Sequence, residues 1–354
     1  MHTTDELYSE ALQLLKQLIA TPSYSKEEQG TAMLLQKFFQ AKGIVAHRLM
    51  NNVWAVNLHF DKEKPTILLN SHHDTVKPNA AYTIDPFCPI EKEGKLYGLG
   101  SNDAGGCLVS LIVTFLHFYP QANLKYNIVI AATAEEEISG ANGIAALLPQ
   151  VGEIAFGIVG EPTEMHMAIA EKGLVVLDCE AKGVSGHAAR DEGHNAIYRA
   201  LQDIAWFRDY RFERESEMLG TVKMSVTVLQ AGTQHNVVPA SCKFTVDVRV
   251  NERYTNEEVV AIVQQHVQCE VVPRSLRLKP TSIDIAHPIV QAGVALGRNC
   301  FGSATLSDKV FMQFPTVKMG PGDSARSHTA DEYIYLQEIR EGIALYIDLL
   351  KSVV

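Results

Sequence analysis

Two kinds of hydrophobic pattern follow one another in the N-terminal part of the chain. Residues 4–20 place apolar side chains at helical spacing and predict an amphipathic helix. The sequence Ser-Lys-Glu-Glu that starts at Ser25 has the capping-box pattern, which predicts a second helix that runs to about Ala41. Continuous apolar runs then predict buried strands, and a helix is expected after Gly105-Gly106. The strands predicted in this block are 44–49, 53–59, 65–71, 126–134 and 154–160, with a further helix near 140–149.

The pattern changes between residues 172 and 282. The predicted order there is strand 174–182, helix 194–208, strands 221–230 and 240–249, helix 255–267 and strand 268–280. This βαββαβ order is typical of a ferredoxin-like module. After Ser282 the α/β pattern returns with helix 288–297, strand 315–319 and helix 332–352. We therefore predict an α/β fold in which residues 1–171 and 283–354 form a discontinuous catalytic domain, and residues 172–282 form an inserted ferredoxin-like domain.

Length and composition narrow the class of protein. A chain of 354 residues exceeds what one hydrophobic core usually serves, which supports two domains. The net charge of -10 and the pI near 5.7 argue against nucleic acid or an anionic membrane as the main partner. The longest apolar stretch, 107–119, is too short to span a bilayer, and the N-terminus lacks the pattern of a signal peptide. The six cysteines are scattered without a CxxC motif, which favours reduced thiols and a cytoplasmic location.

The stretch 133-TAEEEISG-140 places three glutamates directly after a predicted buried strand. Adjacent carboxylates repel one another, and burying one without a partner costs several kcal/mol or forces it to take up a proton. One interpretation is a solvated turn before the next helix. The other is that a cation binds at the end of this strand.

Other predicted strands of the outer domain also end in candidate metal ligands. In open α/β sheets, ligands bind beyond the carboxyl ends of the strands. Two imidazoles with several carboxylates and no thiolate suit zinc, cobalt or manganese at a hydrolytic site. Each signal alone is weak, and we interpret His73 and His194 as structural or surface residues. The candidates are His72 and Asp74 after strand 65–71, Asp103 before a predicted helix, Glu161 after strand 154–160, and His328 in the loop 320-GPGDSARSHTADE-332.

A nucleotide cofactor is a poor alternative for this crevice. The loop 98-GLGSNDAGG-106 resembles a dinucleotide fingerprint, but Asp103 occupies the position of its third glycine. A carboxylate there would face the pyrophosphate, so the sequence argues against a Rossmann site.

Seven motifs in order, HHDTV, GLGSNDAGG, TAEEE, GEPT, SGHAA, NVVP and GPGDSARSH, resemble the M20 family of dinuclear metal aminoacylases and exopeptidases. The likeness covers essentially the whole chain and is greatest to acetylornithine deacetylases and succinyl-diaminopimelate desuccinylases. It implies the following roles: His72 and Glu161 bind one metal, Glu137 and His328 bind the other, Asp103 bridges the two, Asp74 orients the ring of His72, Glu136 is the general base, and Glu135 is a support residue.

A charge count supports this set independently of the resemblance. Two divalent cations, zinc or cobalt, bring +4, and Asp103, Glu137 and Glu161 bring -3. A bridging hydroxide would neutralise the site and leave Glu136 as the spare carboxylate. Proton transfer by that residue requires a carboxyl pKa raised toward neutrality.

The resemblance also assigns two residues of the inserted domain. His187, in 183-GVSGHAAR-190, resembles a histidine that reaches from the partner subunit to stabilise the tetrahedral oxyanion. Asn236, in 235-HNVVP-239, resembles a companion contact to the substrate. Without the family, His187 would be interpreted as a turn residue. The resemblance therefore implies a homodimer.

The substrate is the least determined part of the prediction. Gly322 and Ser324 in the glycine-rich loop, with Arg326 and Arg249, are candidates to bind a substrate carboxylate. We expect hydrolysis of a small N-acylated amino acid of the N-acetylornithine type in arginine biosynthesis, with N-acetyl- or N-succinyl-citrulline also possible. The alternatives are a succinyl-diaminopimelate desuccinylase or a di- or tripeptidase. A non-catalytic homologue would lack Glu136 or a ligand, and a two-metal phosphoesterase would require more basic residues near the metals.

Overall fold

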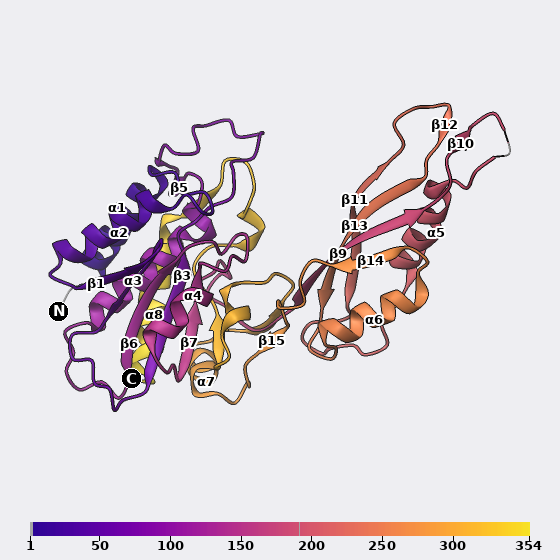
Figure 1. The fold of residues 1–354 in the computed structure, drawn as a ribbon. Coiled ribbons are helices and arrows are strands. Elements are labelled where there is room, and N and C mark those ends of the chain that lie inside the picture. The colour runs from indigo at the N-terminus through magenta and orange to yellow at the C-terminus, as the bar shows by residue number, and fades with distance from the viewer. Residues whose placement is uncertain (1–2, 191) are drawn as a thin grey trace. The chain divides into compact units, whose positions relative to one another are not determined.

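The computed structural model describes residues 3–190 and 192–354. These residues form two compact units (Figure 1). The outer unit contains residues 3–169 with Ile283–Phe301 and Ser307–Val354. The inserted unit contains Ala170–Ser282 with Gly302–Leu306. The short segment 302–306 therefore packs with the inserted unit although it lies far beyond residue 282.

Most strands of a nine-stranded mixed sheet belong to the described part of the outer unit. Its strand order is β1-β2-β6-β3-β7-β17-β8-β15, and β16 pairs with β8. The four central strands β6, β3, β7 and β17 run parallel, and every residue in them is buried. The strands are β1 (Ala46–Leu49), β2 (Asn52–Val56), β3 (Thr66–His72), β6 (Asn127–Thr133), β7 (Phe156–Val159), β8 (Met167–Glu171), β15 (Thr281–Ser282), β16 (Cys300–Ser303) and β17 (Thr316–Lys318).

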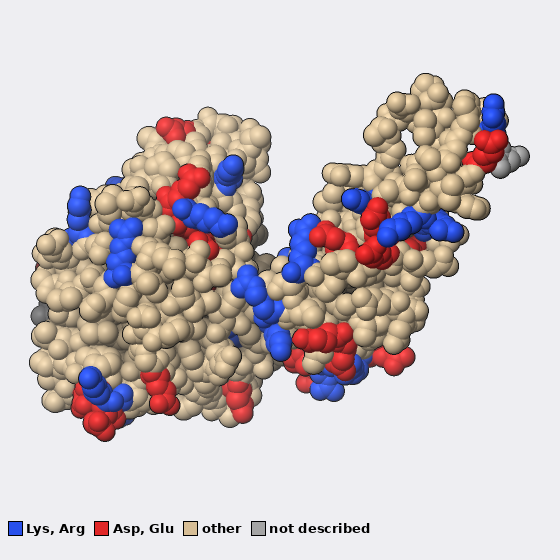
Figure 2. Space-filling view, viewed as in Figure 1, with Lys and Arg blue, Asp and Glu red and all other residues tan. Residues whose placement is uncertain are grey.

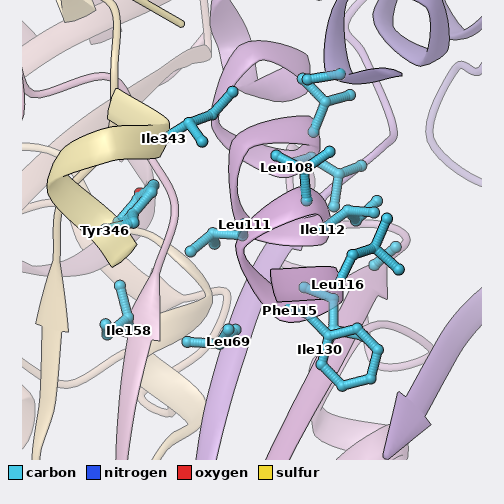
Figure 3. Close-up of a cluster of buried hydrophobic side chains, with 14 of the residues drawn as sticks. Leu69, Leu108, Leu111, Ile112, Phe115, Leu116, Ile130, Ile158, Ile343 and Tyr346 are labelled. Atoms are coloured by element: carbon cyan, nitrogen blue, oxygen red, sulfur yellow. The ribbon is translucent and has the colours of Figure 1, made fainter. Parts of the chain in front are cut away.

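Helices cover both faces of this sheet, as the continuous apolar strands predict. Leu69 on β3 and Ile130 on β6 lie in one buried cluster with side chains of α3 and α8 (Figure 3). Leu68, the residue before Leu69 on β3, belongs to the cluster on the opposite face with α4. Every residue of α3 except His117 is buried. The helices are α1 (Thr4–Ile19), α2 (Gln29–Ala41), α3 (Gly106–Phe118), α4 (Ile144–Val151), α7 (Pro288–Ala295) and α8 (Leu336–Lys351).

The inserted unit has the predicted βαββαβ order. Its antiparallel sheet has the strand order β11-β13-β9-β14. Alternate residues of β9 are buried and form one core with α5 and α6. The elements are β9 (Gly173–Lys182), α5 (Ala196–Asp209), β11 (Lys223–Ala231), β13 (Ser241–Val250), α6 (Asn256–His266) and β14 (Glu270–Pro273), and a separate pair is formed by β10 (Gly186–His187) and β12 (Val237–Val238).

Several predicted boundaries are wrong for local reasons. The capping box at Ser25 does not form, since α2 begins only at Gln29, with Glu28 at its N-cap position; the hydroxyl of Ser25 donates to Asp74. The predicted strand 268–280 is confined to β14. The predicted helix 332–352 loses its start to a strand. That strand, β18 (Tyr333–Tyr335), pairs with β5 (Lys95–Tyr97), which pairs with β4 (Ile90–Lys92), and none of the three was predicted.

Surface and sequence-wide features agree with the composition. On the face drawn in Figure 2, basic and acidic side chains are interspersed rather than gathered into one basic surface. No helix within residues 3–190 and 192–354 is long and apolar enough to cross a membrane. The six cysteines are free thiols, of which Cys107, Cys179 and Cys242 are buried and Cys88 is exposed.

Candidate metal centre

The candidate ligands meet because three parallel strands end at the same edge of the sheet. His72 ends β3, and its register partner is Thr133, the last residue of β6. The three glutamates follow β6 one residue later. Glu161 follows β7, whose last residue, Val159, pairs with Asn70 of β3. The carboxyl ends of these strands therefore deliver an imidazole and several carboxylates to one place.

The imidazole of His72 faces three carboxylates. Its Nε2 lies 3.3 Å from Asp103 Oδ1, 3.6 Å from Glu161 Oε1 and 3.8 Å from Glu136 Oε2. Its Nδ1 lies 2.9 Å from the backbone carbonyl oxygen of Asp74. A carbonyl oxygen can only accept, so Nδ1 carries the proton and Nε2 is left as a potential metal ligand.

Asp103 lies between His72 and a second histidine. Its Oδ2 lies 3.5 Å from His328 Nε2, and that nitrogen lies 3.0 Å from Glu137 Oε2. Each oxygen of Asp103 therefore faces a different imidazole. Two sets of three side chains bring potential ligand atoms within 4.8 Å of one another: His72, Asp103 and Glu137, and His72, Glu136 and Glu161.

The buried carboxylates fit a divalent cation. Glu161 Oε1 is buried and has no hydrogen-bond partner within residues 3–190 and 192–354. Burial, above all, raises the pKa of Glu161 to about 8 and the pKa of Glu136 well above its ordinary value. Burial alone would lower the pKa of His72, but the surrounding carboxylates, Glu136 first, raise it well above 6.5. A cation among these groups would relieve the repulsion that now favours protons.

Asp74 explains how a buried strand can end on three glutamates. Its Oδ1 accepts from the backbone N–H of Glu136 at 3.0 Å, and its Oδ2 accepts from that of Glu137 at 3.2 Å. Oδ2 also accepts from the hydroxyl of Ser25 at 2.7 Å. The Asp74 carboxylate lies 3.4 Å from His72 Nδ1, farther than the Asp74 carbonyl oxygen. Its shortest contacts therefore hold the glutamate backbone, and its carbonyl orients the ring.

Glu135 turns away from the other two glutamates. Its φ of 56° is in the left-handed region. Its carboxylate accepts from the backbone and side-chain nitrogens of Asn142, and its own N–H donates to Glu28 Oε1 at 3.2 Å. Glu135 thus shapes the turn that presents Glu136 and Glu137, and it belongs to neither set of potential ligands.

Three supporting residues were missed by the sequence reasoning. Glu28 is fully buried behind the glutamate turn. Asp308 accepts from Asn70 of β3 and from Thr133, the last residue of β6, and burial is the main cause that raises its pKa to about 6. Glu332 accepts from the backbone of Asp103. All three are charged residues in ordinary-looking segments, so no local pattern marks them as buried.

His73 is a structural residue, as expected. It is buried, its Nε2 donates to the carbonyl of Asn51, and its Nδ1 lies 2.8 Å from the hydroxyl of Thr31. Burial lowers its pKa to about 4, which keeps the ring neutral. His194 is exposed in the inserted unit.

The predicted carboxylate-binding arginines already have partners. Arg326 binds both oxygens of Glu338, at 2.6 and 2.9 Å, and its guanidinium lies over the ring of Tyr333. Arg249 binds both oxygens of Asp247, at 2.8 and 3.1 Å. The structure therefore does not leave Arg326 available as a substrate anchor in its present rotamer.

The glycine-rich loop packs tightly against Asn102. Gly322 has a φ of +94°, and a Cβ there would lie 2.4 Å from Asn102 Oδ1, so glycine is required for close approach. The N–H of Gly320 donates to the hydroxyl of Thr163. Ser324 starts the short 3-10 turn Ser324–Arg326 and is exposed.

His187 and Asn236 are neighbours within the inserted unit. His187 lies on β10, which pairs with β12, and the N–H of Ala188 donates to the carbonyl of Asn236 at 3.0 Å. Both residues are exposed. His187 Nδ1 accepts from the N–H of Ala189 at 3.1 Å, so in the neutral ring Nε2 carries the proton.

Residues 68–352 match the model of peptidase family M20/M25/M40. The chain belongs to this family. The family assignment confirms the resemblance seen in the seven motifs, and the protein is therefore a metal-dependent hydrolase.

Two curated relatives that resemble the chain along most of its length are desuccinylases. The chain is 28% identical over 282 residues to a succinyl-diaminopimelate desuccinylase of Xylella fastidiosa, covering 73% of this chain and 74% of the relative. It is 25% identical over 370 residues to the enzyme of the same name from Delftia acidovorans, covering 94% and 95%. These names favour the alternative substrate expectation over the acetylornithine type.

Solved M20 structures share the fold. A tripeptidase from Staphylococcus aureus superposes with a TM-score of 0.80 at 19% identity and covers 98% of both chains. A dinuclear metal-binding M20 peptidase from Bacillus subtilis superposes with a TM-score of 0.74 at 16% identity and covers 97% of both chains. At these identities the likeness establishes the fold of the outer and inserted units, and the predicted α/β class with a ferredoxin-like insertion is confirmed.

Proposed function

We propose that this M20 hydrolase cleaves the amide bond of a small N-succinylated amino acid at a centre of two divalent metal ions. The observation that carries the proposal is Asp103, whose two carboxylate oxygens face His72 and His328 separately. His72 and Glu161 would hold one ion, and Glu137 and His328 the other. Zinc is the first choice for this nitrogen and oxygen ligand set, and cobalt is the second.

Two such ions would polarise the amide carbonyl and lower the pKa of a water between them. Glu136 is placed to take the proton of that water and to return it to the departing nitrogen. Its carboxylate is largely buried, with a pKa raised by that burial, and its backbone is held by Asp74. A fixed carboxylate whose pKa is raised by burial meets the requirement of a group that must both accept and release a proton in this step.

The remaining roles extend beyond the centre itself. We propose that the protein acts as a homodimer in the cytoplasm, and that His187 of one subunit and Asn236 stabilise the oxyanion and contact the substrate. Their adjacency on β10 and β12, with His187 Nε2 free to donate, supports this role. Arg249 remains our candidate for a substrate carboxylate, because its side chain is 30% exposed beside Asp247.

The desuccinylase proposal rests on the relatives and replaces our acetylornithine expectation. A succinyl group differs from an acetyl group by a second carboxylate, which a cationic or amide-lined site would bind. The test is an assay of zinc- or cobalt-loaded protein against matched N-succinyl and N-acetyl forms of diaminopimelate, ornithine and citrulline, with di- and tripeptides included. We expect kcat/KM for succinyl substrates to exceed that for their acetyl partners by at least about 10-fold.

The Glu136→Gln variant supplies the background in this assay, and metal content is measured on the same samples. Preference for the acetyl form of ornithine or citrulline would overturn the succinyl assignment in favour of deacetylation. Preference for peptides would overturn it in favour of peptidase activity.

A further inference from the structure

We propose that Glu332 is a positioning residue that fixes Asp103 between the two histidines and so sets the affinity of the centre for metal. This inference rests on the proposed dinuclear centre and adds a residue to it. Glu332 is only 2% exposed.

One oxygen of Glu332 holds two consecutive peptide groups. Its Oε1 accepts from the N–H of Asn102 at 2.8 Å and from the N–H of Asp103 at 2.9 Å. Two bonds to one oxygen fix the orientation of adjacent peptide planes, because rotating either plane would break a buried hydrogen bond. The backbone at Asp103 is therefore held from outside its own segment.

The segment around Asp103 needs such an external acceptor. Residues Ser101–Gly105 form a tight turn at the start of α3, but Asp103 has φ -113° and ψ 100°, which is not helical. Regular helix bonds therefore do not dictate where its side chain points. Because Asp103 must present one oxygen to each histidine, a small change of its backbone would lengthen both contacts together.

Glu332 itself is held beside the three-stranded sheet of β18, β5 and β4. Its carbonyl accepts from the N–H of Gly98 at 3.0 Å, directly beside the pairing of Tyr333 with Tyr97. His328 lies four residues earlier on the same segment. A single stretch of chain therefore carries one imidazole of the centre and the carboxylate that fixes the residue between the imidazoles.

Asn102, whose N–H binds Glu332, also binds the loop that carries His328. Its side-chain nitrogen donates to the carbonyl of Asp323 at 3.0 Å, and its side-chain oxygen accepts from the N–H of Asp323 at 3.1 Å. The turn of Asn102 and Asp103 and the loop that carries His328 thus hold each other. Loss of the Glu332 carboxylate would remove the bonds to the backbone of Asn102 and Asp103 and leave the bonds between Asn102 and Asp323.

The decisive measurement is metal affinity, which a purely structural role would leave unchanged in the folded protein. Zinc and cobalt binding to Glu332→Ala and wild type are titrated by calorimetry, and the absorption spectrum of bound cobalt reports its coordination. We expect at least one ion to bind about 10-fold or more weakly and the cobalt spectrum to change, as loss of partners of metal ligands commonly produces.

Asp331→Gly is the matched control. Asp331 is the adjacent carboxylate, its φ is 53°, and it accepts from the N–H groups of Thr83 and Ile84 rather than from Asp103. Glycine tolerates this φ, so the variant removes comparable hydrogen bonds without backbone strain. We expect it to bind both ions within about twofold of wild type on the same physical argument.

Glu332→Gln keeps an oxygen acceptor but removes the charge, and neutral acceptors form weaker bonds. We expect the metal affinity of Glu332→Gln to lie between those of wild type and Glu332→Ala. If the alanine variant does not fold, the metal affinity of Glu332→Gln tests the positioning role. Wild-type affinity and spectrum in the folded Glu332 variants would overturn the positioning role. Binding of fewer than two ions by wild type would instead overturn the dinuclear centre on which it rests.

Discussion

In the outer unit, His72 and Asp103 lie at the end of a sheet whose central strands are wholly buried, and their positions are held by Asp74 and Glu332. In the inserted unit, His187 and Asn236 lie exposed on a pair of two-residue strands. A buried, cross-linked set is preorganised for a metal ion. An exposed pair must be completed by another surface, and the predictions below test this contrast.

Removal of metal should abolish the function of the buried set. Chelation should reduce hydrolysis to background, because Glu136 alone cannot polarise the amide. Restoring zinc or cobalt should recover activity without refolding, since the outer core does not depend on the ions. Activity that persists in chelated protein of verified metal content would contradict a metal-dependent step.

Loss of His187 should be nearly as severe although the residue is exposed. His187→Ala should lower kcat by roughly 100- to 1000-fold, as removal of an oxyanion donor does. Metal affinity should stay at the wild-type level. Activity assays with metal titrations on the same sample check both expectations.

Mixing variants sharpens this test. When His187→Ala and Glu136→Gln exchange subunits, about half of the dimers are mixed, and each has one site with both residues intact. Activity should therefore recover to about a quarter of wild type, if the two sites act independently. No recovery, with exchange verified by native mass spectrometry, would place His187 in its own subunit's site or outside catalysis.

Within the buried set, neighbouring glutamates should separate in their effects. Glu136→Gln should keep two ions and lose at least ~100-fold in kcat, because it removes only the proton carrier. Glu137→Gln should weaken metal binding, since Glu137 Oε2 faces His328 at 3.0 Å. Equal loss of metal in both variants would show that the roles within the triplet are wrongly assigned.

The smallest expected effect concerns the pH dependence of stability. The pKa of His73 is lowered to about 4 by burial, so the unfolded chain binds its proton more readily. Its contribution is present above about pH 6.5 and is lost as pH falls toward 4, by an amount of order 2–3 kcal/mol. His73→Gln should flatten this part of the curve of unfolding free energy against pH, measured by urea denaturation of the loaded protein. An unchanged slope would contradict a neutral buried ring.

The candidate centre could be predicted from the sequence because strand periodicity is a local pattern, and the carboxyl ends of parallel strands meet at one edge of the sheet. His72, Glu161 and the glutamate triplet were named as candidates in this way, while the choice of Glu137 within the triplet and the pairing of roles came from the family resemblance. The supporting residues could not be predicted, because their contacts join distant segments. Ser25, for example, fits a capping box, yet in the structure its hydroxyl donates to Asp74, a residue 49 positions away in the chain.

The partners of the arginines also could not be predicted from local sequence. Arg326 looked available in a glycine-rich loop, but Glu338 lies in the first turn of α8 and binds both of its nitrogens. The inserted unit shows the converse, since its βαββαβ order was predicted from local periodicity while β10 and β12, two residues each, were too short to be recognised.

The position of β17 has a consequence for synthesis of the chain on the ribosome. β17 pairs with β7 in parallel, yet β7 is translated long before it, and the inserted unit emerges between them. The growing chain must therefore carry a half-built sheet with an open, apolar edge at β7 while residues 170–282 fold by themselves. His328 follows β17, so the nascent protein cannot assemble the complete set of candidate metal ligands until translation is almost finished.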